Sequence, residues 1–312
     1  MSPRPIDGST QLVGLIGWPV EHSVSPAMQN AAFEALGLNW RYVPLPVPPG
    51  HIEVAVRGLA ALGFRGANVT VPHKQAALRV LETPASPLTE EVFVAPDAQA
   101  LGAVNTIVLA RSEDDTIIFS GHNTDEAGFL GALRDGGFEP EGTSAVVVGA
   151  GGAARAVVFA LMAAGAETIT ILNRTVKRAR ALVSDLSSAG RMAHPRAIQA
   201  LPLTRETLTE TVGGAQLLVN ATPVGMWPRV DASIWPDGVP IPAQVTVFDL
   251  VYNPLETKLQ QQARASGANA LDGLGMLVRQ GALALELWTG AEAPVAVMRR
   301  ACEQALRTQA RS

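Results

Sequence analysis

The sequence predicts an α/β protein of two domains, and three observations carry this prediction. Its 312 residues exceed the size at which a single hydrophobic core stops growing, which is about 250 to 300 residues. Hydrophobic residues make up 47% of the chain and charged residues 17%, as in compact folded proteins. Two stretches of the sequence alternate apolar, strand-like runs with helical patterns, which is typical of mostly parallel sheets covered by helices.

The first stretch predicts an N-terminal α/β domain. Its expected elements are a strand, a helix, a strand, a helix and a strand, over 12–17 (LVGLIG), Pro26 to Leu36, 40–47 (WRYVPLPV), 51–62 and 66–72 (GANVTVP). Because strands separated by helices usually pair in parallel, we expect a mostly parallel sheet here.

The second stretch contains a glycine-rich segment between a strand and a helix. It begins at Ser144 with AVVVGAGGAARAVVFALMAAG and continues with TITILNRT, a helix, LLVNATP and VTVFDLVY. This pattern predicts a doubly wound nucleotide-binding domain of the Rossmann type. Residues 124–137 are expected to form a connecting helix, capped by Asn123 or Thr124 and ended by Gly136 and Gly137.

The C-terminal segment, from Asp272 onward, shows two helical runs separated by Gly290 and Pro294 and no strand pattern. Since these helices follow a completed nucleotide-binding sheet, we expect them to pack back on the first domain. The expected division assigns 1–123 with 272–312 to substrate binding and catalysis, and 124–271 to the cofactor.

Charge and cysteine content exclude several classes of function. A net charge of −4 argues against nucleic acid as a partner, because binding to a phosphate backbone needs a basic face. The single cysteine, Cys302, has no partner for a disulfide or a structural metal site, so we expect it packed in a helix and expect no metal. No signal-peptide pattern and no apolar run of the ~18 residues that span a bilayer are present, so we expect a cytoplasmic protein without a membrane partner.

The segment VVVGAGGAARA predicts a dinucleotide site, because the first peptide N–H groups of the helix face outward toward an anion. Gly149 is expected to permit the tight turn and Gly151 to let the backbone approach a pyrophosphate. We expect Gly152, with Ala153 and Ala154, to allow close packing of the helix on the strand.

The next strand indicates which dinucleotide binds. An NAD enzyme usually places a carboxylate about 20 residues beyond the glycine turn, whereas this chain has Asn173, Arg174 and Thr175 there. Arg174 can pair with a 2′-phosphate and Arg178 could flank it, so NADP is the expected cofactor. Residues 151–200 are basic as a whole, with two acidic residues (Glu167, Asp185) against seven basic ones: Arg155, Arg174, Lys177, Arg178, Arg180, Arg191 and Arg196.

Three polar clusters lie in apolar segments of the first domain. They are Ser23 with Ser25, Thr70 with Lys74, and Asn105 with Asn123, Thr124 and Asp125. The two serines could grip a carboxylate, although Ser25 could instead cap the helix that starts at Pro26. Hydride addition to a ketone leaves an alkoxide, and Lys74 could supply both a proton and a positive charge, with Asp125 as its partner and without a metal.

The segments that carry these residues resemble the shikimate dehydrogenase family. They are GWPVEHSVSPAMQNAAF, GANVTVPHK, GAVNTI, GHNTDEAG, GAGGAARA, NRTVKRA, VNATPVGM, DLVYNPLETKL and GMLVRQGALALELWTG, in that order over about 270 residues. The resemblance implies NADP-dependent reduction of 3-dehydroshikimate to shikimate, in the biosynthesis of aromatic amino acids, by a monomer or homodimer.

The resemblance also implies roles for individual residues. Lys74 and Asp125 are the catalytic pair, and Ser23 and Ser25 bind the substrate carboxylate. The remaining substrate contacts that it implies are Thr70, Asn105, Tyr252 and Gln280. The cofactor-binding residues that it implies are Gly149, Ala150, Gly151, Gly152, Ala153, Asn173, Arg174, Thr175, Arg178, Thr222, Met226 and Gly273, with Met276 near the nicotinamide.

Three alternatives stay open. His122 stands where many family members have an acidic residue, and it also occurs in relatives that oxidise quinate, so a quinate/shikimate dehydrogenase with looser use of NAD and NADP is one. Glu126, which replaces a small residue of the family, is expected in the first turn of a helix. The second alternative is a non-catalytic sensor of the same ligands. The third is a methylenetetrahydrofolate dehydrogenase, which would not need the serine pair or the GHNTD run.

Overall fold

The computed structural model describes residues 5–83, 90–188 and 197–309, and these form two compact units. Unit 1 comprises Met1–Thr124 and Gln280–Ser312, and unit 2 comprises Asp125–Arg279. The chain thus leaves unit 2 inside a helix, and unit 1 resumes at Gln280, eight residues after the expected position Asp272. Arg191 and Arg196 lie outside the described residues.

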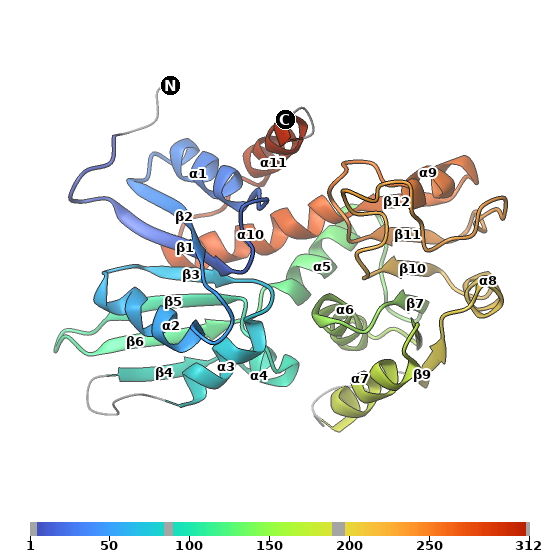
Figure 1. The fold of residues 1–312 in the computed structure, drawn as a ribbon, viewed down its shortest axis with the longest axis horizontal. Helices are drawn as coiled ribbons and strands as arrows, with labels where there is room; N and C mark the ends of the chain where they lie inside the picture. Colours follow the sequence, from blue (N-terminus) through green and yellow to red (C-terminus); the bar gives the residue numbers. More distant parts are fainter. Residues whose placement is uncertain (1–4, 84–89, 189–196, 310–312) are drawn as a thin grey trace. The chain divides into compact units, whose positions relative to one another are not determined.

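Unit 1 is built on a six-stranded sheet with the strand order β2-β1-β3-β5-β6-β4 (Figure 1). The strands are β1 (Gln11–Gly17), β2 (Trp40–Pro46), β3 (Gly66–Val69), β4 (Glu90–Val94), β5 (Thr106–Arg111) and β6 (Ile117–His122). β5 pairs antiparallel with both of its neighbours, and the other pairs are parallel. The prediction of a mostly parallel sheet is therefore confirmed, although β4, β5 and β6 were not foreseen from the sequence patterns.

The helices of unit 1 are α1 (Ser25–Ala35), α2 (Ile52–Ala61), α3 (Lys74–Glu82), α4 (Pro96–Leu101), the end of α10 (Gly273–Thr289) and α11 (Val295–Gln309). α1 packs on α11, and α2 on α3. α1 also lies close against α10: a Cβ atom on Gly281 of α10 would collide with Met28 Cε of α1. Cys302 is fully buried in α11, as predicted, and residues Gln280–Ser312 fall within unit 1.

The start of α1 corrects one prediction. The helix begins at Ser25, its N-cap is Val24, and Val24 makes no capping hydrogen bond. Ser23 Oγ instead accepts a hydrogen bond from the Ser25 backbone N–H at 3.2 Å. The alternative that Ser25 caps a helix starting at Pro26 is therefore wrong, because the helix starts one residue earlier and the serine that satisfies its backbone is Ser23.

Unit 2 is a doubly wound Rossmann fold, as predicted. Its strands are β7 (Ser144–Val148), β8 (Thr168–Asn173), β9 (Ala197–Pro202), β10 (Leu217–Asn220), β11 (Thr246–Asp249) and β12 (Asn269–Asp272). They pair in parallel in the order β12-β11-β10-β7-β8-β9 (Figure 1), the dinucleotide-binding order 3-2-1-4-5-6 read in reverse. Helices α6 (Gly152–Ala163), α7 (Val176–Ser188), α8 (Arg205–Gly213) and α9 (Lys258–Ala265) connect them.

The central strands of unit 2 are apolar along their whole length because helices cover both faces of a doubly wound sheet. Val146, Val147 and Val148 of β7 are at most 1% exposed. The unit opens with α5 (Asp125–Asp135), which ends at Gly136 and at Gly137 with its positive φ of 79°, as predicted. Arg279 in α10 binds both carboxylate oxygens of Asp135, at 2.7 and 2.6 Å, and so ties the start of α10 to the end of α5.

Candidate functional site

The turn that follows β7 requires glycine at its first position. Gly149 has a φ of 120°, and a Cβ atom there would stand 2.8 Å from the Ala221 carbonyl oxygen. Ala221 follows β10, which lies next to β7 in the sheet. The strand order reverses between these two strands. Because ligands of doubly wound sheets bind at this switch point, the turn marks the place where a dinucleotide would lie.

The backbone after Gly149 is open to a ligand. A Cβ atom on Gly151, the N-cap residue of α6, would meet no atom within 4 Å. The same is true of Gly152, which is exposed together with Ala153, whereas Ala154 is fully buried. Of the three residues predicted to allow close packing, Ala154 is therefore buried as expected, whereas the prediction is wrong for Gly152 and Ala153.

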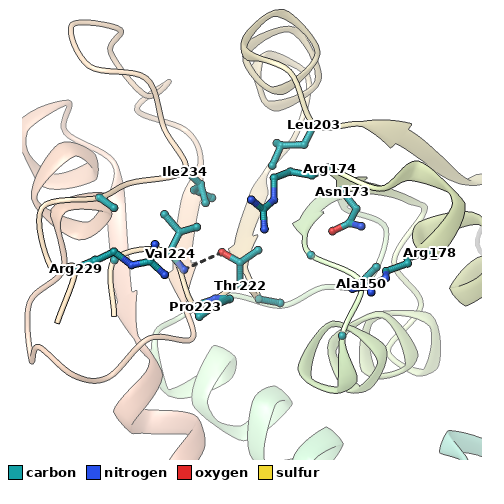
Figure 2. Close-up of a pocket in the computed structure, with 15 residues that line it drawn as sticks. Ala150, Asn173, Arg174, Arg178, Leu203, Thr222, Pro223, Val224, Arg229 and Ile234 are labelled. Atoms are coloured by element: carbon teal, nitrogen blue, oxygen red, sulfur yellow. Dashed lines mark hydrogen bonds between the residues drawn. The ribbon is translucent and has the colours of Figure 1, made fainter. Parts of the chain in front are cut away.

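A cavity of about 400 Å³ lies beside the turn, within unit 2 (Figure 2). Its wall comes from the ends of β7, β8, β9 and β10 and the segments that follow them, four neighbouring strands whose carboxyl ends lie at one edge of the sheet. The lining residues are Gly149, Ala150, Gly151, Asn173, Arg174, Arg178, Leu203, Ala221, Thr222, Pro223, Val224, Gly225, Arg229, Ala232 and Ile234.

The charged side chains in this wall are arginines. Arg174 and Arg178 belong to the predicted set, and Arg229 joins them. Among the described residues that line the cavity none is a carboxylate, so the wall favours a ligand with several phosphate charges. Arg155 was another candidate from the basic stretch, but it forms an ion pair with Asp185 at 3.1 Å.

Arg229 was missed in the sequence analysis, which followed the basic residues after the glycine turn only. It lies in the long loop after β10, and in Figure 2 it stands with Pro223 and Val224 on the side of the cavity away from Asn173 and Arg178. A signal was available, since an arginine two residues beyond the VGMW segment follows a strand that neighbours the glycine turn.

The start of the loop after β10 is held by hydrogen bonds between residues that are two positions apart. Thr222 Oγ1 accepts from the Val224 backbone N–H at 3.2 Å (Figure 2) and donates to Asn220 Oδ1 at 2.6 Å. Thr222 thus lines the cavity as predicted for a cofactor residue. The structure does not place five other predicted cofactor residues in the wall: Gly152, Ala153, Thr175, Met226 and Gly273.

Two of those five residues have roles that the structure explains in another way. Gly273 begins α10, and a Cβ atom there would collide with the Leu250 carbonyl oxygen, so glycine allows two segments of backbone to touch. The Thr175 carbonyl oxygen accepts a hydrogen bond from Asn173 Nδ2 at 2.9 Å, which shapes the turn that carries Arg174.

In unit 1, Asn105 organises the polar residues at the strand ends. It is 2% exposed; its Oδ1 accepts from the Thr124 backbone N–H at 2.9 Å, and its Nδ2 donates to Thr124 Oγ1 at 3.1 Å. Asn68 Nδ2 donates to the Asn105 carbonyl oxygen at 3.3 Å, and the Tyr42 hydroxyl donates to Asn68 Oδ1 at 2.8 Å. This network fixes the segment that leads into Asp125, so Asn105 also has a structural role.

Other predicted residues of unit 1 stand at ends of elements. Lys74 is the first residue of α3 and is half-buried, and its carbonyl oxygen accepts from the Val104 N–H at 3.0 Å. Thr70 follows β3 and is half-buried, and its N–H donates to the Ile16 carbonyl oxygen at 2.8 Å. Gln280 is half-buried in α10. Unit 1 therefore contains Ser23, Ser25, Thr70, Lys74, Asn105 and Gln280, and unit 2 contains Asp125 and Tyr252.

Two residues that depart from the family pattern also have clear surroundings. His122 ends β6 with its ring 6.2 Å from that of Phe93, and burial lowers the pKa of His122 while Asp97 opposes this shift. Its neutral form is therefore favoured near pH 7. Glu126 lies in the first turn of α5, as predicted, where a negative charge suits the helix dipole.

Across the described ranges, no group of three or more histidine, cysteine, aspartate or glutamate side chains is arranged to hold a metal ion. Within the same ranges, no helix is both long and apolar enough to cross a bilayer.

Comparison with known proteins adds relatives along the whole chain. Family models match residues 15–107 (shikimate dehydrogenase substrate binding domain), 136–205 (shikimate/quinate 5-dehydrogenase) and 273–303 (shikimate 5′-dehydrogenase C-terminal domain). The shikimate dehydrogenase (NADP(+)) of Methanopyrus kandleri is 47% identical over 97% of this chain and 98% of its own length.

Solved structures agree with this similarity. A shikimate dehydrogenase in complex with NADP+ superposes with a TM-score of 0.82 at 37% identity, covering 98% of this chain and 99% of that one. The enzyme from Thermus thermophilus, in complex with NADP(H) and shikimate, gives a TM-score of 0.78 at 38% identity, covering 95% and 100%. On the family models and the full-length identity together, the chain belongs to the shikimate dehydrogenase family.

Proposed function

We propose that this protein is an NADP-dependent shikimate dehydrogenase, which interconverts 3-dehydroshikimate and shikimate in the biosynthesis of aromatic amino acids. The observation that carries the proposal is the cavity at the glycine turn, whose charged lining residues are all arginines, in a chain of this family. A wall of this kind suits a dinucleotide with an additional phosphate.

The residues of the cavity fit NADP. The open backbone at Gly151 leaves room for a pyrophosphate beside the N-terminus of α6, where unpaired N–H groups favour an anion. Arg174 and Arg178 would hold the 2′-phosphate, and Arg229 would add positive charge from the loop after β10. When bound, NADPH supplies the hydride that reduces the ring ketone.

The catalytic work of the chain falls to Lys74. As an ammonium group it gives a proton to the oxygen on which negative charge develops, and it takes that proton back when shikimate is oxidised. Asp125 is its proposed partner carboxylate. Ser23 and Ser25 are the proposed ligands of the substrate carboxylate, and the contacts to ring hydroxyls and ring atoms are assigned to Thr70, Asn105, Tyr252 and Gln280.

The substrate range is tested by a panel of three reactions. Reduction of NADP+ is followed with shikimate, with quinate and with neither, and the series is repeated with NAD+. We expect turnover with shikimate and NADP+ above every other combination. Comparable turnover with quinate would instead assign a quinate/shikimate dehydrogenase, and absence of turnover with both acids, in a protein that still binds NADPH, would assign a ligand sensor.

The proposal retains two expectations about the whole protein, a cytoplasmic location and a monomeric or homodimeric state. Cell fractionation followed by immunodetection measures the location. Light scattering during size-exclusion chromatography measures the mass of the particle, and a species larger than a dimer would contradict the second expectation.

A further inference from the structure

Unit 2 buries a carboxylate that the proposed reaction does not use. Asp249 ends β11 and is 0% exposed. Its Oδ2 accepts from Thr257 Oγ1 at 2.6 Å, and its Oδ1 accepts from Asn220 Nδ2 at 2.9 Å and from the Val251 N–H at 3.1 Å. Burial raises the pKa of Asp249, and these three neutral donors oppose the shift. A carboxylate buried at such a cost, with neutral partners, suggests a positional role.

Two chains of hydrogen bonds, called arms below, start from Asp249, and the first arm leads to the cavity. Asn220 is fully buried, and its Oδ1 accepts from both the hydroxyl and the backbone N–H of Thr222, at 2.6 and 3.1 Å. Asn220 Nδ2 donates to the Val224 carbonyl oxygen at 3.2 Å as well as to Asp249. One amide therefore holds both ends of the segment 222–224, which lines the cavity.

The Asp249 carboxylate, the Val224 carbonyl and the Thr222 N–H all require the same orientation of that amide. An ionised carboxylate only accepts hydrogen bonds, so the NH₂ group of Asn220 must face Asp249 and its oxygen must face Thr222. The flipped amide would set two acceptor oxygens against each other at Asp249 and two donors against each other at the Thr222 N–H. The carboxylate thus reinforces the only amide orientation that can hold the segment 222–224.

The second arm leads away from the cavity. The Thr257 hydroxyl, which donates to Asp249, accepts from the Gln260 N–H at 3.3 Å, and Gln260 Oε1 accepts from the Thr257 N–H at 3.0 Å. These bonds form a capping box at the start of α9. Thr257 is 0% exposed and does not line the cavity, so it offers a control that touches the same carboxylate.

We propose that Asp249 is a positioning residue for cofactor binding, because it fixes the Asn220 amide and, through it, the segment 222–224 of the cavity wall. The identity of the ligand rests on the proposed function, but the positioning role is tested by binding alone. Asp249 itself does not line the cavity, and its effect is expected on the affinity for NADPH.

The test compares the two arms by direct titration with NADPH, followed by fluorescence, together with the melting temperature without ligand. Asp249→Ala and Asn220→Ala are each expected to raise the Kd for NADPH about tenfold, which corresponds to ~1.4 kcal/mol, because the segment 222–224 is no longer held in place. Thr257→Val is expected to lower the melting temperature but to leave the Kd within about twofold of the wild-type value.

The double variant Asp249→Ala/Asn220→Ala isolates the proposed pathway. If Asp249 acts through Asn220, the double variant loses about as much affinity as either single variant, whereas independent effects would multiply to about a hundredfold. Multiplied effects, or a folded Asp249→Ala variant with wild-type affinity, would overturn the proposal. Should Asp249→Ala fail to fold, an unchanged Kd in Asn220→Ala overturns it equally. Failure of the wild type to bind NADPH would instead contradict the proposed function.

Discussion

The two units position their proposed binding residues in different ways. In unit 2 the wall of the cavity starts from backbone that only glycine can form, as at Gly149 with its φ of 120°. In unit 1 the predicted substrate residues depend on side chains that hold one another: the Asn105 amide donates to the Thr124 hydroxyl, and the Tyr42 hydroxyl donates to Asn68. A backbone requirement leaves a local motif in the sequence, whereas a network of distant side chains leaves none, and this difference determines what a sequence can reveal.

The largest expected effect separates the units by function. Lys74→Ala should lower turnover at least ~100-fold, the usual effect of losing a general acid-base group, because Lys74 gives and takes the proton. The Kd for NADPH should stay at its wild-type value, since the cofactor cavity lies wholly in unit 2. Arg79→Ala, an exposed position on the same helix, is the control. Near-normal turnover in Lys74→Ala would remove this residue from the mechanism.

The serine pair tests the substrate side of the comparison. Ser25→Ala should raise the KM for shikimate roughly 10- to 100-fold, because a hydrogen bond to a charged group contributes roughly 1.5 to 3 kcal/mol. Since Ser25 is not the helix cap, the melting temperature of the Ser25→Ala variant should differ little from that of the wild type.

Ser23→Ala should raise the same KM and should also lower the melting temperature, because the Ser25 N–H loses its acceptor. A shikimate analogue with a neutral group in place of the carboxylate is the control for both variants. Strong binding of that analogue to the wild type would contradict the proposed carboxylate contact.

The arginines test the cofactor side. Arg174→Asp should raise the KM for NADP+ at least about tenfold and should affect NAD+ much less, because the new carboxylate repels a 2′-phosphate. Arg180→Asp makes the same charge change at an exposed position of α7 outside the cavity wall, and its KM for NADP+ should change little. Equal effects of the two variants would mean that the overall charge of the unit matters and the position does not.

The smallest effects distinguish two glycines of the same turn. Gly149→Ala should lower the free energy of unfolding by about 1 to 3 kcal/mol, because its φ is unfavourable and its Cβ atom would clash with the Ala221 carbonyl. Gly151→Ala should leave stability nearly unchanged and weaken NADPH binding only, since its Cβ atom would point into open space where a ligand fits. Chemical denaturation and NADPH titration measure the two effects, and a stability loss at Gly151 would contradict this assignment.

The sequence predicts those parts of the molecule that short-range rules control. The Rossmann domain, its glycine turn and Arg174 follow from the pattern of one strand, one turn and the next strand. Periodicity could not place Arg229, because it lies in the long loop after β10, whose first residues are held by the Asn220 amide. The antiparallel β5 was also not foreseen, and the alternative that Ser25 caps a helix failed because the helix begins one residue earlier than expected.

The central claim is that this protein transfers hydride between NADP and shikimate, and the ratio of kcat/KM for NADP+ to that for NAD+ with saturating shikimate tests it most directly. The arginine-lined wall predicts a ratio of at least about ten, which corresponds to ~1.4 kcal/mol of preference in the transition state. A ratio near one, or no reduction of either cofactor by shikimate, would contradict the account.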